Sequence, residues 1–161
     1  MNKTLLASMA LGLAGAAAIV GLIVLRQRGV TPDLVGEITA VRTLGMDASS
    51  SVAIVDLRFT NEGRFPFIVR TCEMSVVDAK GETQQGQVVA ASDANQLFDL
   101  FPAVGLKAGE PLTIKTKIAP RDSRKAMLTA RFEIPKAELD ARQKIVLTIT
   151  EVDGAVSQFS R

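Results

Sequence analysis

The stretch SVAIVDLRFT, residues 51–60, alternates apolar and polar side chains along its length. The apolar residues that share one face of an extended strand are Ala53, Val55, Leu57 and Phe59. Asp56 and Arg58 fall on the opposite face. A period of two predicts a half-buried strand. A strand with one buried and one solvent-exposed face favours an antiparallel sheet, because the strands of a parallel sheet are usually apolar on both faces.

The same pattern recurs outward from this stretch. Clear alternation covers residues 111–119, 126–134 and 144–150, and weaker strand patterns cover residues 34–42, 67–77 and 84–91. Turn-forming residues separate several of these segments, at 61–63, 78–81 and 153–154. The chain is therefore predicted to be mainly β, an immunoglobulin-like antiparallel β-sandwich of about seven strands. The chain has one Cys and no Trp, which excludes the Cys…Trp…Cys core of antibody domains.

One short helix is predicted. Residues 135–143, PKAELDARQ, place Pro135 at a natural first-turn position and follow it with good helix formers. Residues 92–109 are expected to form a long segment without regular secondary structure. Their apolar cluster at residues 97–102 must be buried against another surface.

The N-terminal sequence MNKTLLASMALGLAGAAAIVGLIVLRQR contains no charge between residues 5 and 25. As a helix, these residues would span about 30 Å, the thickness of the hydrocarbon core of a bilayer. A cleavable signal peptide has a shorter apolar region, of about 7–15 residues. The sequence therefore predicts a retained transmembrane helix, with the following domain outside the cytoplasm. Cleavage and secretion is the alternative.

The predicted organisation is a membrane anchor at residues 1–28, a linker at 29–33 and a β-sandwich domain at 34–161. Within the anchor, two pairs of small residues have the spacing that lets another helix approach closely. They are Gly12 with Ala16, and Ala17 with Gly21. A generic membrane span that is rich in Ala and Gly would show the same spacing.

The charge of the chain does not indicate nucleic-acid binding. The net charge of +2 includes Lys3, Arg26 and Arg28, and without them the chain has 16 basic and 17 acidic residues. No Lys/Arg-rich block with interleaved aromatic residues is present. The expected partners are a membrane, crossed once, and another protein subunit, with no nucleic acid.

The sequence predicts no catalytic, cofactor-binding or metal-binding residues. It contains no His, which removes the commonest general base and the usual zinc ligand. No glycine-rich phosphate loop occurs. Cys72 and Met74 lie two residues apart, on one strand face, and soft ligands suit Cu(I). The alternative is that this pair packs in the core.

Two apolar clusters are candidates for a partner-binding surface, since contiguous exposed apolar area marks interaction sites. The first is in RFPF, residues 64–67, and the second is in residues 97–102. The candidate residues are Phe65, Phe67, Leu97, Phe98 and Phe101. Packing at the edge of the sandwich is the alternative for both clusters.

Residues 55–81, VDLRFTNEGRFPFIVRTCEMSVVDAKG, resemble the core of the LEA14/WHy family of late embryogenesis abundant and water-stress domains. The similar elements are a strand that ends at Asn61, the pair Pro66-Phe67 and a small-residue turn at 78–81. The sequence departs from the pattern of the family at Glu62, where the family typically has Pro. The resemblance implies a β-sandwich without catalytic residues, associated with stress protection or interaction.

These observations favour a non-enzymatic, membrane-anchored accessory or interaction protein. It would present a β-sandwich outside the cytoplasm, in the periplasm or at the cell surface, as a subunit of a larger membrane complex. A LEA14-like, stress-protective secreted domain is the alternative. A copper-handling sandwich that uses Cys72 and Met74 is a further alternative.

Overall fold

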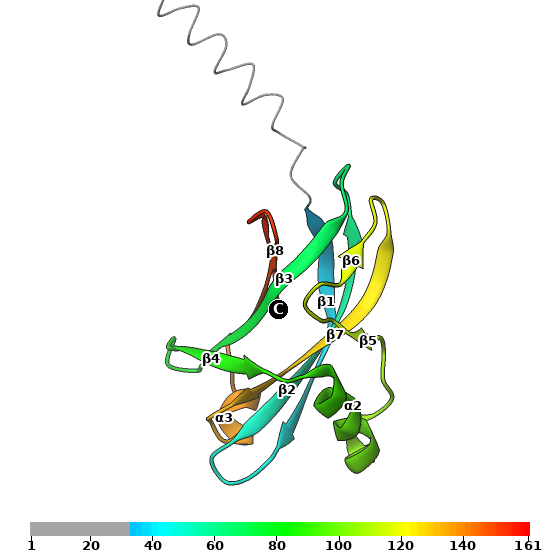
Figure 1. The fold of residues 1–161 in the computed structure, drawn as a ribbon. Coiled ribbons are helices and arrows are strands. Elements are labelled where there is room, and N and C mark those ends of the chain that lie inside the picture. The colour runs from blue at the N-terminus through cyan, green and yellow to red at the C-terminus, as the bar shows by residue number, and fades with distance from the viewer. Residues whose placement is uncertain (1–32) are drawn as a thin grey trace, which may run out of the picture. The chain divides into compact units, whose positions relative to one another are not determined.

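The computed structural model describes residues 33–161, which form a mainly β structure with two short helices (Figure 1). The strands of this region are β1 (Leu34–Gly45), β2 (Ser51–Asn61), β3 (Phe67–Val77), β4 (Thr83–Val88), β5 (Glu110–Pro111), β6 (Lys117–Ile118), β7 (Ser123–Phe132), β8 (Lys144–Glu151) and β9 (Val156–Ser160). The helices are α2 (Ala91–Leu100) and α3 (Lys136–Asp140), with a 3₁₀ turn η1 (Pro102–Val104).

The strands form two layers that share one crossing strand. The hydrogen-bonded order is β1-β2-β7-β4-β3-β8-β9, and all neighbours in this order are antiparallel. β4 pairs with β3 through residues 83–86 and with β7 through residues 87–88, so it passes from one layer to the other. Gly86 lies at this crossing, where an added Cβ would come within 2.6 Å of the Phe132 ring. The architecture confirms a β-sandwich.

The main core lies between the layers, where the predicted inward faces meet. The residues of these faces in β2, β7 and β8 are all buried: Ala53, Val55, Leu57, Phe59, Leu128, Ala130, Phe132, Ile145, Leu147 and Ile149. Three phenyl rings, of Phe59, Phe67 and Phe132, are the largest fully buried side chains. Period-two alternation therefore identified the inward faces of these strands correctly.

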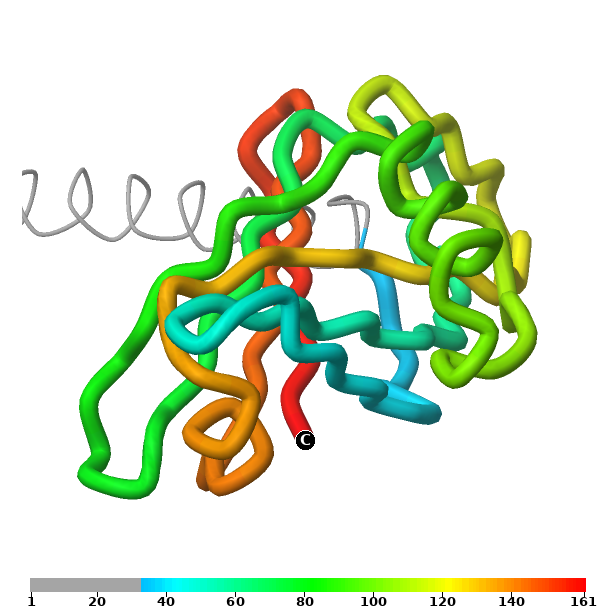
Figure 2. The backbone as a smooth tube through the Cα atoms, turned by 90° about the horizontal axis from the view of Figure 1, so that it is seen from below, coloured from blue at the N-terminus to red at the C-terminus, as the bar shows by residue number. Residues whose placement is uncertain are grey.

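The second face of β2 is also buried over most of its length, which the alternation did not predict. Residues 51–57 are all buried, including Asp56, which is only 5% exposed. At Val52 and Ile54 the reason is α2, which forms largely within the segment predicted to be irregular, whereas Asp56 is covered by its ion pair with Arg42. Val52 and Ile54 of β2 join Met127 of β7 and residues of α2 and η1 in a second cluster. Figure 2 shows α2 and the β3–β4 turn on opposite sides of the molecule.

The predicted strand at residues 111–119 was wrong. β5 pairs with β7 in parallel, whereas β6 pairs with β3, so the chain changes partner between them. The change requires a tight turn, in which Lys115 has φ 66° and Thr116 N donates to Thr113 O. Ile114, expected on the buried face, is exposed.

Side chains connect the two end strands of the order, β1 and β9. Ser157 Oγ accepts a hydrogen bond from Leu34 N at 3.0 Å, and Arg161 Nη1 donates to Thr39 O at 2.6 Å. These bonds occupy two of the backbone groups that β1, as an edge strand, would otherwise offer to another chain. Among residues 33–161 no helix is both long and apolar enough to cross a membrane. The predicted anchor at 1–28, with Gly12, Ala16, Ala17 and Gly21, lies outside the described residues.

Candidate functional site

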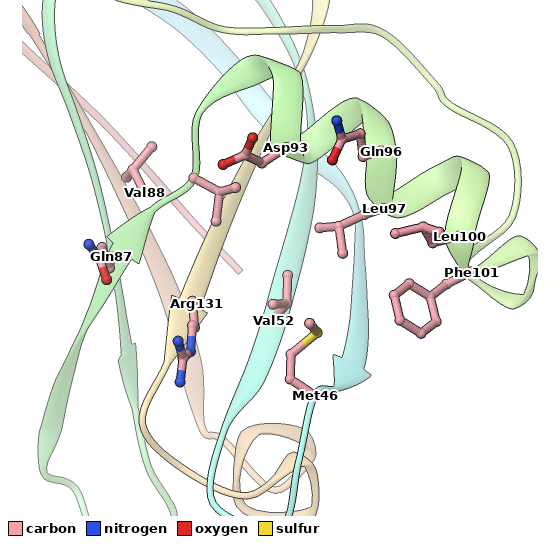
Figure 3. Close-up of a pocket in the computed structure, with 11 residues that line it drawn as sticks. Met46, Val52, Gln87, Val88, Asp93, Gln96, Leu97, Leu100, Phe101 and Arg131 are labelled. Carbon is pink, nitrogen blue, oxygen red and sulfur yellow. The ribbon is translucent and has the colours of Figure 1, made fainter.

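A groove of about 500 Å³ lies between α2 and the outer face of β2, β4 and β7 (Figure 3). It is named the α2 groove below. Its lining residues are Met46, Val52, Gln87, Val88, Val89, Asp93, Gln96, Leu97, Leu100, Phe101 and Arg131. The volume is within the range of about 300–1,000 Å³ that is typical of ligand pockets.

The chain path after β4 creates this groove. Val89 N donates to Thr129 O at 2.9 Å, which holds the end of β4 against β7. α2 begins two residues later and runs over the outer face of β2. Its Leu97 packs into the second cluster and is 8% exposed, whereas Leu100 is 70% exposed at the mouth of the groove. One face of the helix therefore closes the cluster and its C-terminal turn leaves apolar area uncovered.

Arg42 fastens the segment that follows α2. Its Nη2 donates to Asp56 Oδ1 and Oδ2, at 2.6 and 2.8 Å. Its Nη1 donates to Val104 O at 3.1 Å and to Leu106 O at 2.9 Å. Its guanidinium also lies 5.1 Å from the centre of the Phe98 ring, within cation–π range. One side chain thus joins β1, β2, α2 and the loop after η1.

The rim of the groove is polar and the floor is apolar. Asp93 and Gln96 project from α2, and Gln87 and Arg131 project from β4 and β7 (Figure 3). Arg131 also pairs with Glu133 at 3.3 Å. Amide and charged groups around an apolar floor suit the binding of apolar side chains whose backbone remains hydrogen-bonded. The lining contains no nucleophile paired with a base.

The structure brings some of the predicted partner-binding residues together. Leu97 and Phe101 line the α2 groove, and Phe98 packs beside them against Arg42. Sequence reasoning missed the ion pair of Arg42 with Asp56, because Asp56 was placed on the solvent-facing side of its strand. The sequence feature that could have indicated this pair is Asp56 itself. A charged residue within an otherwise apolar strand needs a partner of opposite charge, and an arginine is available in the neighbouring strand.

The structure separates Phe65 from Phe67. Phe67 is the first residue of β3, is fully buried in the main core and pairs with Ile118. Its interpretation as a surface residue was wrong. Phe65 precedes the strand, so strand alternation does not apply to it, and it is 52% exposed. Asn61 Nδ2 donates to Phe65 O at 2.9 Å and holds this loop in place.

Cys72 and Met74 point toward the main core. Met74 is fully buried, and Cys72 is partly buried against the same cluster. Burial raises the pKa of the Cys72 thiol to about 12. Metal binding requires the thiolate, and burial makes that deprotonation more costly. Residues 33–161 also contain no group of three or more His, Cys, Asp or Glu side chains placed to hold a metal ion. The geometry therefore favours the packing interpretation.

No protein-family model and no curated protein matches the chain. Solved structures with a similar fold include an uncharacterised β-sandwich protein from Clostridium difficile 630, at 9% identity and a TM-score of 0.42, with 81% of this chain and 87% of that chain covered. A second is the archaellum periplasmic stator protein complex FlaF and FlaG from Sulfolobus acidocaldarius, at 11% identity and a TM-score of 0.35, with 80% and 87% covered. An ApaG protein from Pseudomonas aeruginosa PAO1 has 9% identity and a TM-score of 0.36, with 71% and 90% covered.

Proposed function

We propose that this protein is a non-enzymatic, membrane-anchored accessory protein that binds a partner protein through the α2 groove. The apolar segment at residues 5–25 is the proposed anchor, and the β-sandwich is proposed to lie outside the cytoplasm. The absence of His from the whole sequence, and of a nucleophile–base pair in the groove lining, supports a binding role.

The observation that carries the proposal is the apolar surface at the mouth of the α2 groove. Leu100 is 70% exposed and Met46 is 45% exposed, and both continue the apolar lining outward. Exposed apolar area next to a formed pocket is typical of a protein-binding surface.

The occupant of the groove is proposed to be a short apolar segment of another protein. Its apolar side chains would fill the floor formed by Val52, Val88 and Leu97. Gln87 and Gln96 offer amide groups that can both donate to and accept from a peptide backbone. A segment of this kind would be buried in the centre of the interface, where most binding free energy is concentrated.

Site-specific photo-crosslinking of the full chain in native membranes tests the groove. A crosslinking residue at Leu100 is expected to give an adduct with one defined protein, and Leu100→Asp is expected to abolish co-purification of that protein in mild detergent. The control is Leu106→Asp, because Leu106 is 93% exposed but does not line the groove. Co-purification that survives Leu100→Asp, or is lost equally in both variants, contradicts the proposal.

Carbonate extraction and protease protection test the anchor and the side of the membrane. The full-length chain should stay in the membrane pellet at alkaline pH. Protease added to the outer side of the membrane should digest the β-sandwich in intact spheroplasts. Release of full-length protein into the soluble fraction would contradict the proposed membrane anchor. Protection of the domain from protease would contradict its proposed location outside the cytoplasm.

A further inference from the structure

One end of the sandwich collects exposed apolar residues around the point where the chain enters β1. Strand register places the start of β1, the β2–β3 loop, the β6–β7 turn and the β8–β9 turn at this end, which is named the tether end (Figure 1). Eight large hydrophobic residues of the described region are exposed, and four of them are here. They are Val35, Phe65, Val152 and Val156.

Hydrogen bonds hold the entry point of the chain against these loops. Asp33 O accepts from Glu62 N at 3.1 Å, in the loop that carries Phe65. Asp33 Oδ1 accepts from Ser157 Oγ at 3.1 Å, next to Val156. Phe65 therefore has a fixed place close to the first described residue of the chain.

The sequence before Asp33 limits how far the tether end can lie from a membrane. Seven residues, 26–32, separate Asp33 from the apolar segment at 5–25. Fully extended, seven residues reach about 25 Å. If residues 5–25 cross the bilayer, the tether end cannot leave the neighbourhood of the lipid headgroups.

We infer that the tether end rests on the bilayer surface, with Phe65 and Val152 at the boundary between headgroups and acyl chains. This inference rests on the membrane anchor of the proposed function. Phe is among the residues that bury an apolar face at this depth. Contact with lipid would cover apolar area that residues 33–161 leave exposed, and it would orient the sandwich so that the opposite end of β1 points away from the membrane.

The charges at the tether end indicate that apolar contact, and not attraction to anionic lipid, provides the binding. Arg64 lies in the β2–β3 loop together with Glu62, and Arg121 lies in the β6–β7 turn. Asp33 at the chain entry and Asp153 in the β8–β9 turn add negative charge. Because positive charge is not in excess at this end, docking is expected on vesicles of neutral phosphatidylcholine as well as on anionic ones.

The absence of Trp and Tyr from the chain makes a direct test possible. The full-length Phe65→Trp variant would be reconstituted into phosphatidylcholine vesicles, with or without bromine on the acyl chains. The single indole is expected to lose most of its emission in the brominated vesicles. Val152→Trp is a second reporter at the same end and should be quenched too.

Met46→Trp is the matched control. Met46 is 45% exposed, close to the 52% of Phe65, but it follows the far end of β1, about 35 Å away along the strand. The emission of this control variant should not change with bromination.

Three outcomes would contradict the inference, and they differ in what they overturn. Equal emission from the Phe65→Trp variant in both vesicle types, with the chain still retained after carbonate extraction, overturns the docking alone. A blue-shifted but unquenched indole in that variant also overturns it, since a protein surface then covers the residue. Release of the chain by carbonate overturns the proposed anchor itself. It also removes the argument that residues 26–32 keep the tether end close to the membrane.

Discussion

The main core and the second cluster share β2 and β7 but are closed in different ways. Between the layers, both walls are hydrogen-bonded strands, and the rings of Phe59, Phe67 and Phe132 fill the space between them. Under α2, one wall is a single ten-residue helix, and the cluster has six buried residues. The α2 groove opens directly beside it.

This difference indicates where the molecule is stable and where it can bind. A wall made of strands is fixed along its whole length by backbone hydrogen bonds, whereas α2 is fixed by a few side chains and by Arg42. α2 has no side-chain cap at its N-terminus and no basic residue in its last turn. Surfaces that bind partners are often built on elements of low local stability. The proposed binding site is therefore next to the less stable of the two clusters.

A matched pair of leucine substitutions is expected to separate the clusters most strongly. Leu147→Ala in the main core should lower the free energy of unfolding by about 4 kcal/mol, because a fully buried side chain leaves a cavity that rigid walls cannot close. Leu97→Ala should cost about 2 kcal/mol, because α2 can settle into the space. Chemical denaturation of the full chain in detergent measures both. Equal costs would show that α2 is as firmly fixed as a strand.

Removing the partner of Arg42 is expected to have the next largest effect. Asp56→Ala should cost about 3 kcal/mol, because it leaves a largely buried guanidinium without its carboxylate. The double variant Arg42→Met/Asp56→Leu should be less destabilised than Asp56→Ala, since no unpaired charge remains. Amide hydrogen exchange should rise in α2 and η1 and stay unchanged in β8. A double variant that is less stable than Asp56→Ala would contradict this account of the ion pair.

The two clusters also differ in how far the sequence predicts them. The main core follows from alternation, because each of its strands has one apolar face. α2 was missed because Ser92, Asp93, Asn95 and Asp99 are weak helix formers and no cap marks its start. Packing of Leu97 and Ala94 on β2 decides its structure, and this contact is not visible in local sequence.

The candidate site was predictable only in part for the same reason. Leu97, Phe98 and Phe101 were identifiable as apolar residues that needed a partner surface. Arg42 was not, because its contact with Asp56 depends on the register of β1 on β2, which shifts between Ile38 and Ala40. The error at Phe67 has a local cause, since Phe67 is the first residue of β3 and packs in the main core, whereas Phe65 lies in the loop before the strand.

The pH dependence of stability in alkaline solution should test how well the edge of the main core, where Cys72 packs, excludes water. Burial raises the pKa of this thiol to about 12, so it stays protonated in the folded protein while the unfolded thiol ionises near pH 9. Its contribution to stability is complete below pH 9 and is lost as pH rises toward 12, by about 1 kcal/mol between pH 9 and 10. Denaturation of the wild type and of Cys72→Ala across this range measures it. An identical alkaline slope in both proteins would mean that water reaches the thiol.

The smallest expected effect concerns α3, which differs from α2 because its Leu139 is fully buried and belongs to the main core. Asp140 accepts hydrogen bonds from Lys136 and from Thr43 of β1, and these bonds lower the pKa of its carboxyl group. A lowered pKa stabilises the fold above the ordinary pKa of Asp, near 4, and this contribution is lost as pH falls through the folded value. Because the group is exposed, the loss should be below about 1 kcal/mol.

Melting temperatures measured from pH 7 to pH 3 should therefore fall slightly less for Asp140→Asn than for the wild type. Asp99→Asn, on α2, serves as the control for removal of one exposed carboxylate. A larger change for Asp99→Asn than for Asp140→Asn would contradict the assignment. Because Leu139 already holds α3 in the main core, losing the Asp140 bonds should not release this helix. α2 lacks such an anchor in the main core, so the loss of Arg42 should loosen it.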